Sequence, residues 1–417
     1  MTGAACVLGG SRAMASRIVF VYGGVFAERD WARLGLDEAR RRGLEVEIVE
    51  LHGPVGLTVD GAAAPLFPST VRPQTVAAAE SHLARLTDHD AVLADVALNH
   101  ESAWLYRLFA RKGVRYAVFT QGALPTFHRR PWKTTRGMDE YLHARAQDAL
   151  LWAHLAKRFA CRRFDRDLGY AALAAPAIWL KAGDAPGALT AHFPHPARAR
   201  VVDVESFDMG LARAEMARPE PAPDGAYAVF LDEMFVSHPD FALIGAAPPP
   251  IAPERYFELL RNAFDRIERE TGLNVVVAAH PKARYGSAEL FGGREIAQGR
   301  TAALVRGARL VLAHCSTSLG FAVAFRKPVL LLAGAAMEAT PYGVTIARFA
   351  SWLGAPRLDM AEPALPRDWA TLDDAAYDAY ARAFLARPGA SREPTALTAA
   401  RALLGDAVYS DGAKPRD

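Results

Sequence analysis

Short apolar segments alternate with helix-like segments along this chain, and this alternation constrains the fold more than any other feature. Buried strands are predicted in the first half at residues 17–22, 45–51, 91–97, 116–122 and 201–206. Helical spacing is found at residues 28–44, 74–86, 102–112 and 138–164. Because parallel strands need long crossover connections, this order predicts a parallel sheet covered by helices on both faces.

The same alternation begins again after a proline-rich segment. Strands are predicted at residues 226–233, 274–279, 310–313 and 328–334, and helices at 253–272, at 301–307 and from near Ser316. Residues 217–226 contain three prolines and no apolar periodicity, which is typical of an exposed connection between domains. The expected fold is therefore α/β, with two doubly wound, Rossmann-like domains facing each other across a cleft.

The length of 417 residues fits two domains of about 200 residues each. The expected division is a loose N-terminal leader at residues 1–16, an N-terminal domain at 17–216, the linker at 217–226 and a C-terminal domain at 227–417 that includes the last helices.

Composition excludes several classes of function. The formal net charge is only +3, whereas a general nucleic-acid binder needs a dense field of Lys and Arg. Cys6, Cys161 and Cys315 are far apart in the chain and form no CxxC pair, so neither a zinc site nor a disulfide framework is expected. Residues 1–16 lack an export signal, and no apolar stretch approaches the roughly 20 residues of a membrane span. We therefore expect a cytoplasmic protein, with any contact at the inner membrane being peripheral.

Ligands of such sheets bind beyond the carboxyl ends of the strands, so the polar residues at those ends are the candidate site. His280, Pro281 and Lys282 follow the strand at 274–279. The imidazole and the ammonium group can both donate hydrogen bonds to phosphate oxygens, and the proline restricts the backbone. An exposed loop with a chance histidine is an equally good interpretation of so short a signal.

A second candidate lies between the strand at 310–313 and the next helix. It consists of His314, Ser316, Thr317 and Ser318. Hydroxyls in this position can cap the helix, and the backbone N–H groups of a first helical turn can bind phosphate. A plain helix cap is the alternative, but a cap needs only one hydroxyl, so three beside a histidine favour a binding function.

The third candidate is the pair Asp232 and Glu233 at the end of the strand at 226–233. Two carboxylates at a sheet edge can deprotonate an acceptor hydroxyl or bind part of a ligand. A solvated pair that closes the strand is the alternative.

The order of these motifs resembles that of bacterial surface-polysaccharide glycosyltransferases of the GT-B type. It is similar in particular to those with a His-Pro motif: sialyltransferases, polysialyltransferases and capsular Kdo transferases. The resemblance covers mainly residues 200–335 and is carried by residues 201–210, 228–241, 280–282, 316–318 and 325–332. It implies a nucleotide-sugar donor whose CMP part is held by His280 and by Ser316 to Ser318, a glycan or lipid-linked glycan acceptor, and no cofactor.

The general base is left open between two positions. The sialyltransferase families have an acidic pair followed by glycine in the N-terminal domain, whereas Asp232 and Glu233 are followed by Met234 and come after the linker. Asp95, at the end of the strand at 91–97, is the second candidate base, although an aspartate there also serves as a turn or helix-start residue.

Two further segments carry weaker signals. Arg129, Arg130 and Lys133 lie among aromatic residues and are candidates for binding an anionic glycan, a lipid-linked acceptor or a membrane surface, with a solvated loop as the alternative. Residues 165–167 spell the Asp-x-Asp pattern of metal-dependent transferases but follow a helix instead of a strand, so no metal site is predicted.

The sequence thus predicts a metal-independent glycosyltransferase that uses a nucleotide-activated donor, preferably a CMP-linked acidic sugar such as Kdo or a sialic-acid-like sugar. The acceptor glycan is expected on the N-terminal domain and the donor on the C-terminal domain. A UDP-sugar-dependent transferase and a nucleotide-sugar epimerase of the same fold remain alternatives, as does a non-catalytic sugar-binding protein.

Overall fold

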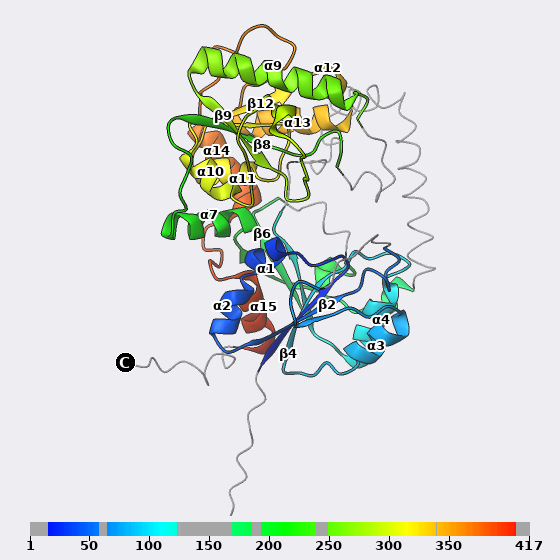
Figure 1. Ribbon diagram of the computed structural model, residues 1–417. Helices are drawn as coiled ribbons and strands as arrows, with labels where there is room; N and C mark the ends of the chain where they lie inside the picture. Colours follow the sequence, from blue (N-terminus) through cyan, green and yellow to red (C-terminus); the bar gives the residue numbers. More distant parts are fainter. Residues whose placement is uncertain are drawn as a thin grey trace, which may run out of the picture.

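The computed structural model describes residues 16–57, 65–122, 125, 169–185, 193–238, 249–338 and 340–405. These residues form two parallel sheets, each covered by helices on both faces, in two bodies stacked one above the other (Figure 1). The predicted fold class is confirmed.

The first sheet has seven strands in the order β3-β2-β1-β4-β5-β6-β7. They are β1 (Arg17–Tyr22), β2 (Glu45–Glu50), β3 (Thr70–Val71), β4 (Asp90–Asp95), β5 (Tyr116–Thr120), β6 (Ile178–Ala182) and β7 (Arg200–Val204). All the pairings are parallel, and β1 lies between β2 and β4. The strand order therefore reverses between β1 and β4.

The second sheet has six parallel strands in the order β10-β9-β8-β11-β12-β13. They are β8 (Tyr227–Leu231), β9 (Asn274–Ala279), β10 (Ile296–Gln298), β11 (Leu310–Ala313), β12 (Val329–Ala333) and β13 (Arg357–Asp359). The order reverses between β8 and β11. Both sheets thus have the strand order of a dinucleotide-binding fold, in which a crevice opens where the order reverses.

Alternate residues of β1 belong to the two cores of the first body. Ile18 and Phe20 pack with α1 (Glu28–Leu34), α2 (Leu36–Arg41) and α15 (Thr395–Leu404). Val19 and Val21 pack on the other face with α3 (Val76–Leu83) and α4 (Ala103–Lys112). The period of two in a strand sends successive side chains to opposite faces, so a continuous apolar run is needed in a strand that is covered on both sides.

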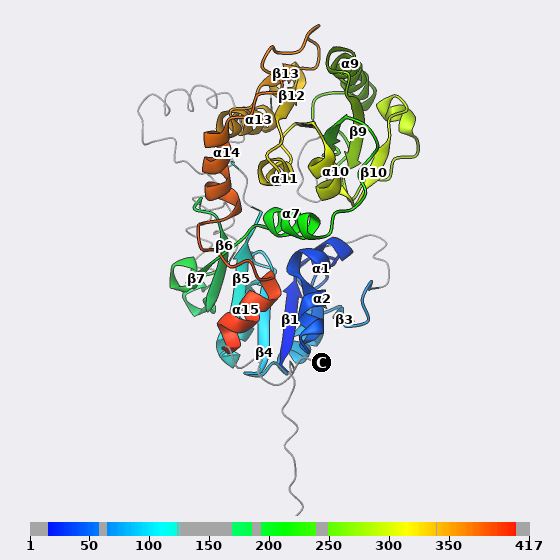
Figure 2. The ribbon, with the colours of Figure 1, turned by 90° about the vertical axis from the view of Figure 1, so that its left-hand side faces the viewer.

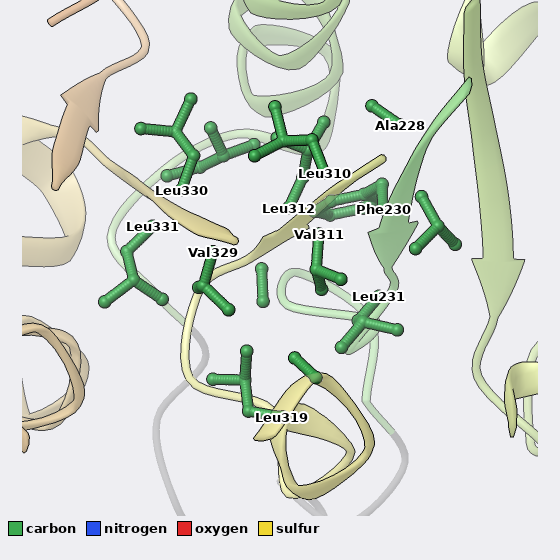
Figure 3. Packing of buried hydrophobic residues seen from close by; sticks show 14 of the residues in the cluster. Ala228, Phe230, Leu231, Leu310, Val311, Leu312, Leu319, Val329, Leu330 and Leu331 are labelled. Atoms are coloured by element: carbon green, nitrogen blue, oxygen red, sulfur yellow. The ribbon is translucent and has the colours of Figure 1, made fainter. Parts of the chain in front are cut away.

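A single large core fills the second body. Its strands β8, β11 and β12 are buried at every position, and Figure 3 shows their side chains packing on one another and on Leu319 of α11 (Leu319–Ala324). The remaining helices are α9 (Pro253–Thr271), α10 (Thr301–Gly307), α12 (Ala335–Glu338), α13 (Pro341–Leu353) and α14 (Asp374–Tyr380), with a short π-helix at Ala381–Leu385.

The helix predicted at 28–44 is divided in two. Gly35 has a φ of 69° and ends α1 before α2 begins. A Cβ atom at this position would lie 2.4 Å from the side chain of Pro394, the residue before α15. Glycine therefore allows the start of α15 to pack closely against the break between α1 and α2. Strand β6 was not predicted, because its segment has a composition rich in alanine and proline.

The C-terminal helix corrects the predicted domain division. Residues 227–417 were assigned to the second domain, but α15 packs on the first sheet. Its apolar residues Ala396, Leu397, Ala400 and Leu403 are buried there, beside β4 and β6. In Figure 1 this red helix lies in the lower body, with the blue and cyan strands.

The proline-rich segment is not the crossing between the two bodies. Helix α7 (Phe207–Ala217) precedes it and already packs on α10 and α11 of the second body, where Glu215 forms an ion pair with Arg306. Figure 2 shows α7 between the two bodies. The chain therefore crosses from the first body to the second before α7. The segment that returns to the first body runs beside this crossing: the Ser206 N–H donates to the Leu385 carbonyl, and the Glu205 N–H donates to the Ser391 carbonyl.

Replacing Leu312 of β11 with alanine should lower the free energy of unfolding of the second body by about 3 kcal/mol, because a cavity would remain in a fully buried core. Urea unfolding followed by circular dichroism measures the change. The matched control is Leu66→Ala, at a side chain that is 63% exposed, with an expected change of less than about 0.5 kcal/mol. Equal losses in the two variants would contradict the packing described for Leu312.

Candidate functional site

The points where the two strand orders reverse supply the candidate site. In the first sheet this point is at the carboxyl ends of β1 and β4, where Asp95 lies. In the second sheet it is at the ends of β8 and β11, where Asp232, Glu233 and His314 follow the strands. Ligands of open α/β sheets bind at such points.

A cavity of about 370 Å³ lies between the two bodies. This volume is within the usual range of small-molecule sites, about 300–1,000 Å³. Its polar lining comes from both bodies and includes Arg33 of α1, Asp95, Gln121, Asp208 of α7 and Thr317. Aromatic side chains, among them Phe119, Phe193, Phe207 and Tyr380, form much of the remaining wall.

Asp95 is the candidate base that faces this cavity. Its carboxylate forms no hydrogen bond or ion pair with any residue that the structure describes. Asp95 is exposed to the open cavity at the end of β4, and its pKa is raised to about 6, first by the surrounding protein that replaces part of its hydration and next by the negative charge of Asp30. Asp95 is thus mostly ionised at neutral pH and remains able to accept a proton.

Asp232 is buried and fully engaged with its own domain. One carboxylate oxygen accepts a hydrogen bond from the Met234 N–H at 3.0 Å. The other accepts from the His280 N–H at 3.0 Å and from the Tyr285 hydroxyl at 2.7 Å. This side chain therefore fixes the end of β9 against the end of β8, and its burial excludes the solvated pair that was the alternative to a candidate base.

Glu233 makes the corresponding contacts on the other side of β8. Its Oε1 accepts hydrogen bonds from the N–H groups of His314 at 3.0 Å and Cys315 at 2.8 Å, and its Oε2 accepts from the Cys315 thiol at 3.3 Å. Burial raises the pKa of Glu233 to about 7. The acidic pair thus connects β8 to both neighbouring strand ends.

His280 is half-buried at the end of β9, and its Nδ1 accepts a hydrogen bond from the Lys282 N–H at 3.2 Å. Its pKa is lowered to about 4, chiefly by burial and next by His238, so the ring is neutral at pH 7. With Nδ1 as acceptor, the proton is on Nε2, which is then a donor. The positive charge of Arg29 in α1 also lowers this pKa, so the first body contributes to the electrostatic potential at His280.

His314 is corrected by the structure, because it is 0% exposed and both of its ring nitrogens have partners. Nδ1 donates to the Leu332 carbonyl at 2.8 Å, and Nε2 accepts from the Tyr256 hydroxyl at 2.9 Å. Burial lowers the pKa of the ring to about 4. This histidine belongs to the core and cannot contact a donor in the crevice.

The turn from Ser316 to Ser318 also differs from the predicted phosphate site. Helix α11 has only six residues, and the N–H groups of its first turn donate to carbonyls three residues earlier, from Ser316 to Ser318. The Ser318 N–H donates to the Ser316 hydroxyl at 3.2 Å. Thr317 is exposed and is the one predicted donor residue that lines the cavity within the described part of the chain.

The predicted donor residues lie on the two strands that flank β8. His280, Pro281 and Lys282 follow β9, and Ser316 to Ser318 follow β11. Pro281 and Lys282 are exposed. Strands two places apart in a sheet are separated by about 10 Å, so the two groups occupy the same edge at a spacing that one nucleotide can span.

Some of the predicted residues lie outside the described part of the chain: Arg129, Arg130, Lys133 and the Asp-x-Asp segment at 165–167. Over residues 16–57, 65–122, 169–185, 193–238, 249–338 and 340–405, no three His, Cys, Asp or Glu side chains are grouped in a way that could hold a metal ion. In the same ranges, no helix has the length and apolar content that a bilayer span requires.

No sequence pattern singles out Arg33 and Asp208, which also line the cavity. Arg33 occurs in an amphipathic helix with many other charged residues, and Asp208 has the position of an ordinary first-turn acid after the cap Ser206. Helix α1 of the first body faces α7, which lies between the two bodies (Figure 2). Only this packing brings the side chains of Arg33 and Asp208 to the cavity.

No protein-family model matches the chain, and no curated protein matches its sequence. Solved structures that are similar over most of its length include the wall teichoic acid polymerase TagF, with 12% identity and a TM-score of 0.49 over 95% of this chain and 89% of the other. The glycosyltransferase SnogD from Streptomyces nogalater has 14% identity and a TM-score of 0.44 over 93% and 98%. The UDP-GlcNAc 2-epimerase from Methanocaldococcus jannaschii has 10% identity and a TM-score of 0.43 over 92% and 98%. These values support no inference about function.

Glu233→Gln should change how stability depends on pH. The folded protein keeps the Glu233 proton up to about pH 7, whereas the unfolded chain loses it near the ordinary value of 4.5. The wild type should therefore lose stability relative to the glutamine variant as pH rises from about 5 to 7, by at most about 1.4 kcal/mol per pH unit. Urea unfolding at pH 5, 6, 7 and 8 tests this, and a difference that is constant with pH would contradict the raised pKa.

Proposed function

We propose that this protein is a glycosyltransferase that moves a sugar from a nucleotide donor to an acceptor hydroxyl in the crevice between its two bodies. The observation that carries the proposal is the position of Asp95 at the reversal point of the first sheet: its carboxylate has no partner among the described residues, and it lines a cavity that Thr317 reaches from the second body. The donor would occupy the second body and the acceptor the first.

Asp95 is the proposed general base. Its carboxylate takes the proton of the acceptor hydroxyl while the hydroxyl oxygen attacks the anomeric carbon. The bond from that carbon to the phosphate oxygen breaks, and the nucleotide leaves with the electron pair. A base with a pKa of about 6 is ionised at neutral pH and still takes a proton readily. Asp232 and Glu233 would act through the positions of their neighbours.

His280 and the turn at Ser316 to Ser318 are proposed to hold the phosphate and ribose of the donor. The Nε2–H of the neutral His280 ring and the hydroxyls of the turn are hydrogen-bond donors on one sheet edge. Fixed donors aimed at a leaving phosphate stabilise the charge that develops on it, because they need no reorganisation during the reaction. Lys282, exposed beside His280, would add a positive charge.

CMP is the nucleotide that we propose, with an acidic sugar such as Kdo or a sialic-acid-like sugar. This choice follows from the resemblance of the His-Pro and serine motifs to transferases that use such donors. Thermal unfolding with CMP, UDP, GDP and dTDP tests it, because a ligand that binds only the native state raises the apparent stability. A larger shift with UDP would indicate a UDP-sugar-dependent transferase.

Incubation with donor alone separates the remaining alternatives. A nucleotide-sugar epimerase would yield an isomer of the donor without an acceptor. A sugar-binding protein would show saturable binding without release of nucleotide in any mixture. A transferase releases nucleotide at an accelerated rate when its acceptor is added.

Asp95→Asn should lower the transfer rate by about 10² to 10⁴, because the amide cannot accept the proton. In the wild type, kcat should rise with pH through about 6 and then level off, since the base works in its ionised form. Rates of nucleotide release between pH 5 and 8 measure both effects. The matched control is Asp88→Asn, at an exposed aspartate before β4, with an unchanged rate. A variant at Asp95 with near wild-type turnover would remove this assignment.

His280→Ala should weaken CMP binding by about 10- to 100-fold, since a hydrogen bond to a charged group contributes about 1.5–3 kcal/mol. Isothermal titration with CMP measures the loss. His89→Ala, at an exposed histidine of the first body, serves as the control and should bind like the wild type. Equal affinities in the wild type and His280→Ala would place the nucleotide elsewhere.

A further inference from the structure

Two charged side chains of the cavity, Arg33 and Asp208, form no hydrogen bond and no ion pair with any residue that the structure describes. Asp208 is only 9% exposed, and its carboxylate accepts no hydrogen bond from any described residue. Arg33 forms no ion pair within the described part of the chain, and its Nε is buried without a hydrogen-bond acceptor. Buried polar groups are normally paired, and leaving one unpaired costs about 1–3 kcal/mol or more.

The two side chains belong to different helices and meet only in this cavity. Arg33 projects from α1 of the first body, and its guanidinium carbon lies 5.7 Å from the centre of the Phe207 ring. Asp208 is the next residue along α7. Each side chain influences the pKa of the other through its charge, yet the pair forms no salt bridge. A group placed between them could satisfy both.

We propose that Arg33 and Asp208 bind neighbouring hydroxyl groups of a neutral sugar, which is the acceptor of the reaction. A sugar hydroxyl both donates and accepts hydrogen bonds, so it can donate to the Asp208 carboxylate and accept from the Arg33 guanidinium. Asp95, in the same cavity, then lies near a further hydroxyl of that sugar. This assignment of the acceptor class rests on the proposed transferase function.

The charges of the cavity favour a neutral ligand. Its lining contains two carboxylates, Asp95 and Asp208, and one guanidinium, Arg33. Asp208 is buried, and burial raises its pKa to about 6. A carboxylate on the acceptor sugar itself, held between Arg33 and Asp208, would add a third negative charge to a cavity that already has two carboxylates and one guanidinium, and it would be repelled by the buried Asp208 carboxylate. The aromatic wall provides apolar surface for the carbon skeleton of a sugar ring.

Gly320 of the second body leaves the space that the Asp208 side chain occupies. A Cβ on this residue of α11 would lie 2.4 Å from Asp208 Oδ2. Alanine is otherwise favourable at a helical position, so Gly320→Ala should displace the Asp208 carboxylate without weakening the helix itself. It offers a way to disturb the subsite while the carboxylate remains present.

The test is saturation-transfer NMR and titration with methyl β-D-galactopyranoside, methyl β-D-glucopyranoside and methyl α-D-mannopyranoside, with CMP at saturation. Methyl β-D-glucuronide is the anionic counterpart. At least one neutral glycoside should bind the full-length wild type, and more tightly than the glucuronide. Asp208→Asn, Arg33→Gln and Gly320→Ala should each weaken that glycoside at least fivefold. The matched control is Asp265→Asn, at an exposed carboxylate of α9, with unchanged binding.

Several outcomes would overturn the subsite: glucuronide bound better than the neutral glycosides, no glycoside bound by the wild type, or unchanged binding in both Asp208→Asn and Gly320→Ala. Failure of the proposed transferase function would be recognised by a different measurement: none of CMP, UDP, GDP and dTDP would raise the melting temperature. If Asp208→Asn does not fold, as judged by its melting curve, Arg33→Gln and Gly320→Ala decide the question.

Discussion

The hydrogen bonds of two adjacent carboxylates organise the edge of the second sheet at the carboxyl ends of its strands. Asp232 accepts a hydrogen bond from the His280 N–H, just after β9. Glu233 accepts hydrogen bonds from the backbone N–H groups of the two residues that follow β11. Backbone N–H groups at strand ends would otherwise be left without acceptors in a poorly hydrated place. The two side chains satisfy these groups and thereby fix the position of His280 relative to the turn at Ser316 to Ser318.

The chain path couples the two bodies, and this has consequences for the crevice. Helix α15 returns to the first sheet, and its Thr395 hydroxyl donates to the side chain of Gln121, which lines the cavity. The outgoing and returning segments run side by side, held by backbone hydrogen bonds. Movement of one body against the other would have to take place around this double crossing, next to Asp208 and the cavity.

Side chains from both bodies and from the crossing helix line one cavity. Asp95 comes from β4, Arg33 from α1, Asp208 from the crossing helix α7, and Thr317 from the second body. Apolar and aromatic walls with a few convergent polar groups are the usual form of a small-molecule site. Asp208 is buried in this wall, and limited access of water there both disfavours its charge and strengthens the hydrogen bonds that it can form.

The sequence by itself determined the fold class, because apolar runs of strand length alternating with helices leave few arrangements other than parallel sheets covered on both faces. It also identified strand ends, and so Asp95 and His280, since these follow directly from the local pattern. It could not distinguish the exposed Thr317 from the buried His314 three residues earlier, because burial depends on what packs against the turn. The assignment of α15 to the first body and the meeting of Arg33 with Asp208 were decided by tertiary structure alone, since both depend on contacts between segments far apart in the chain.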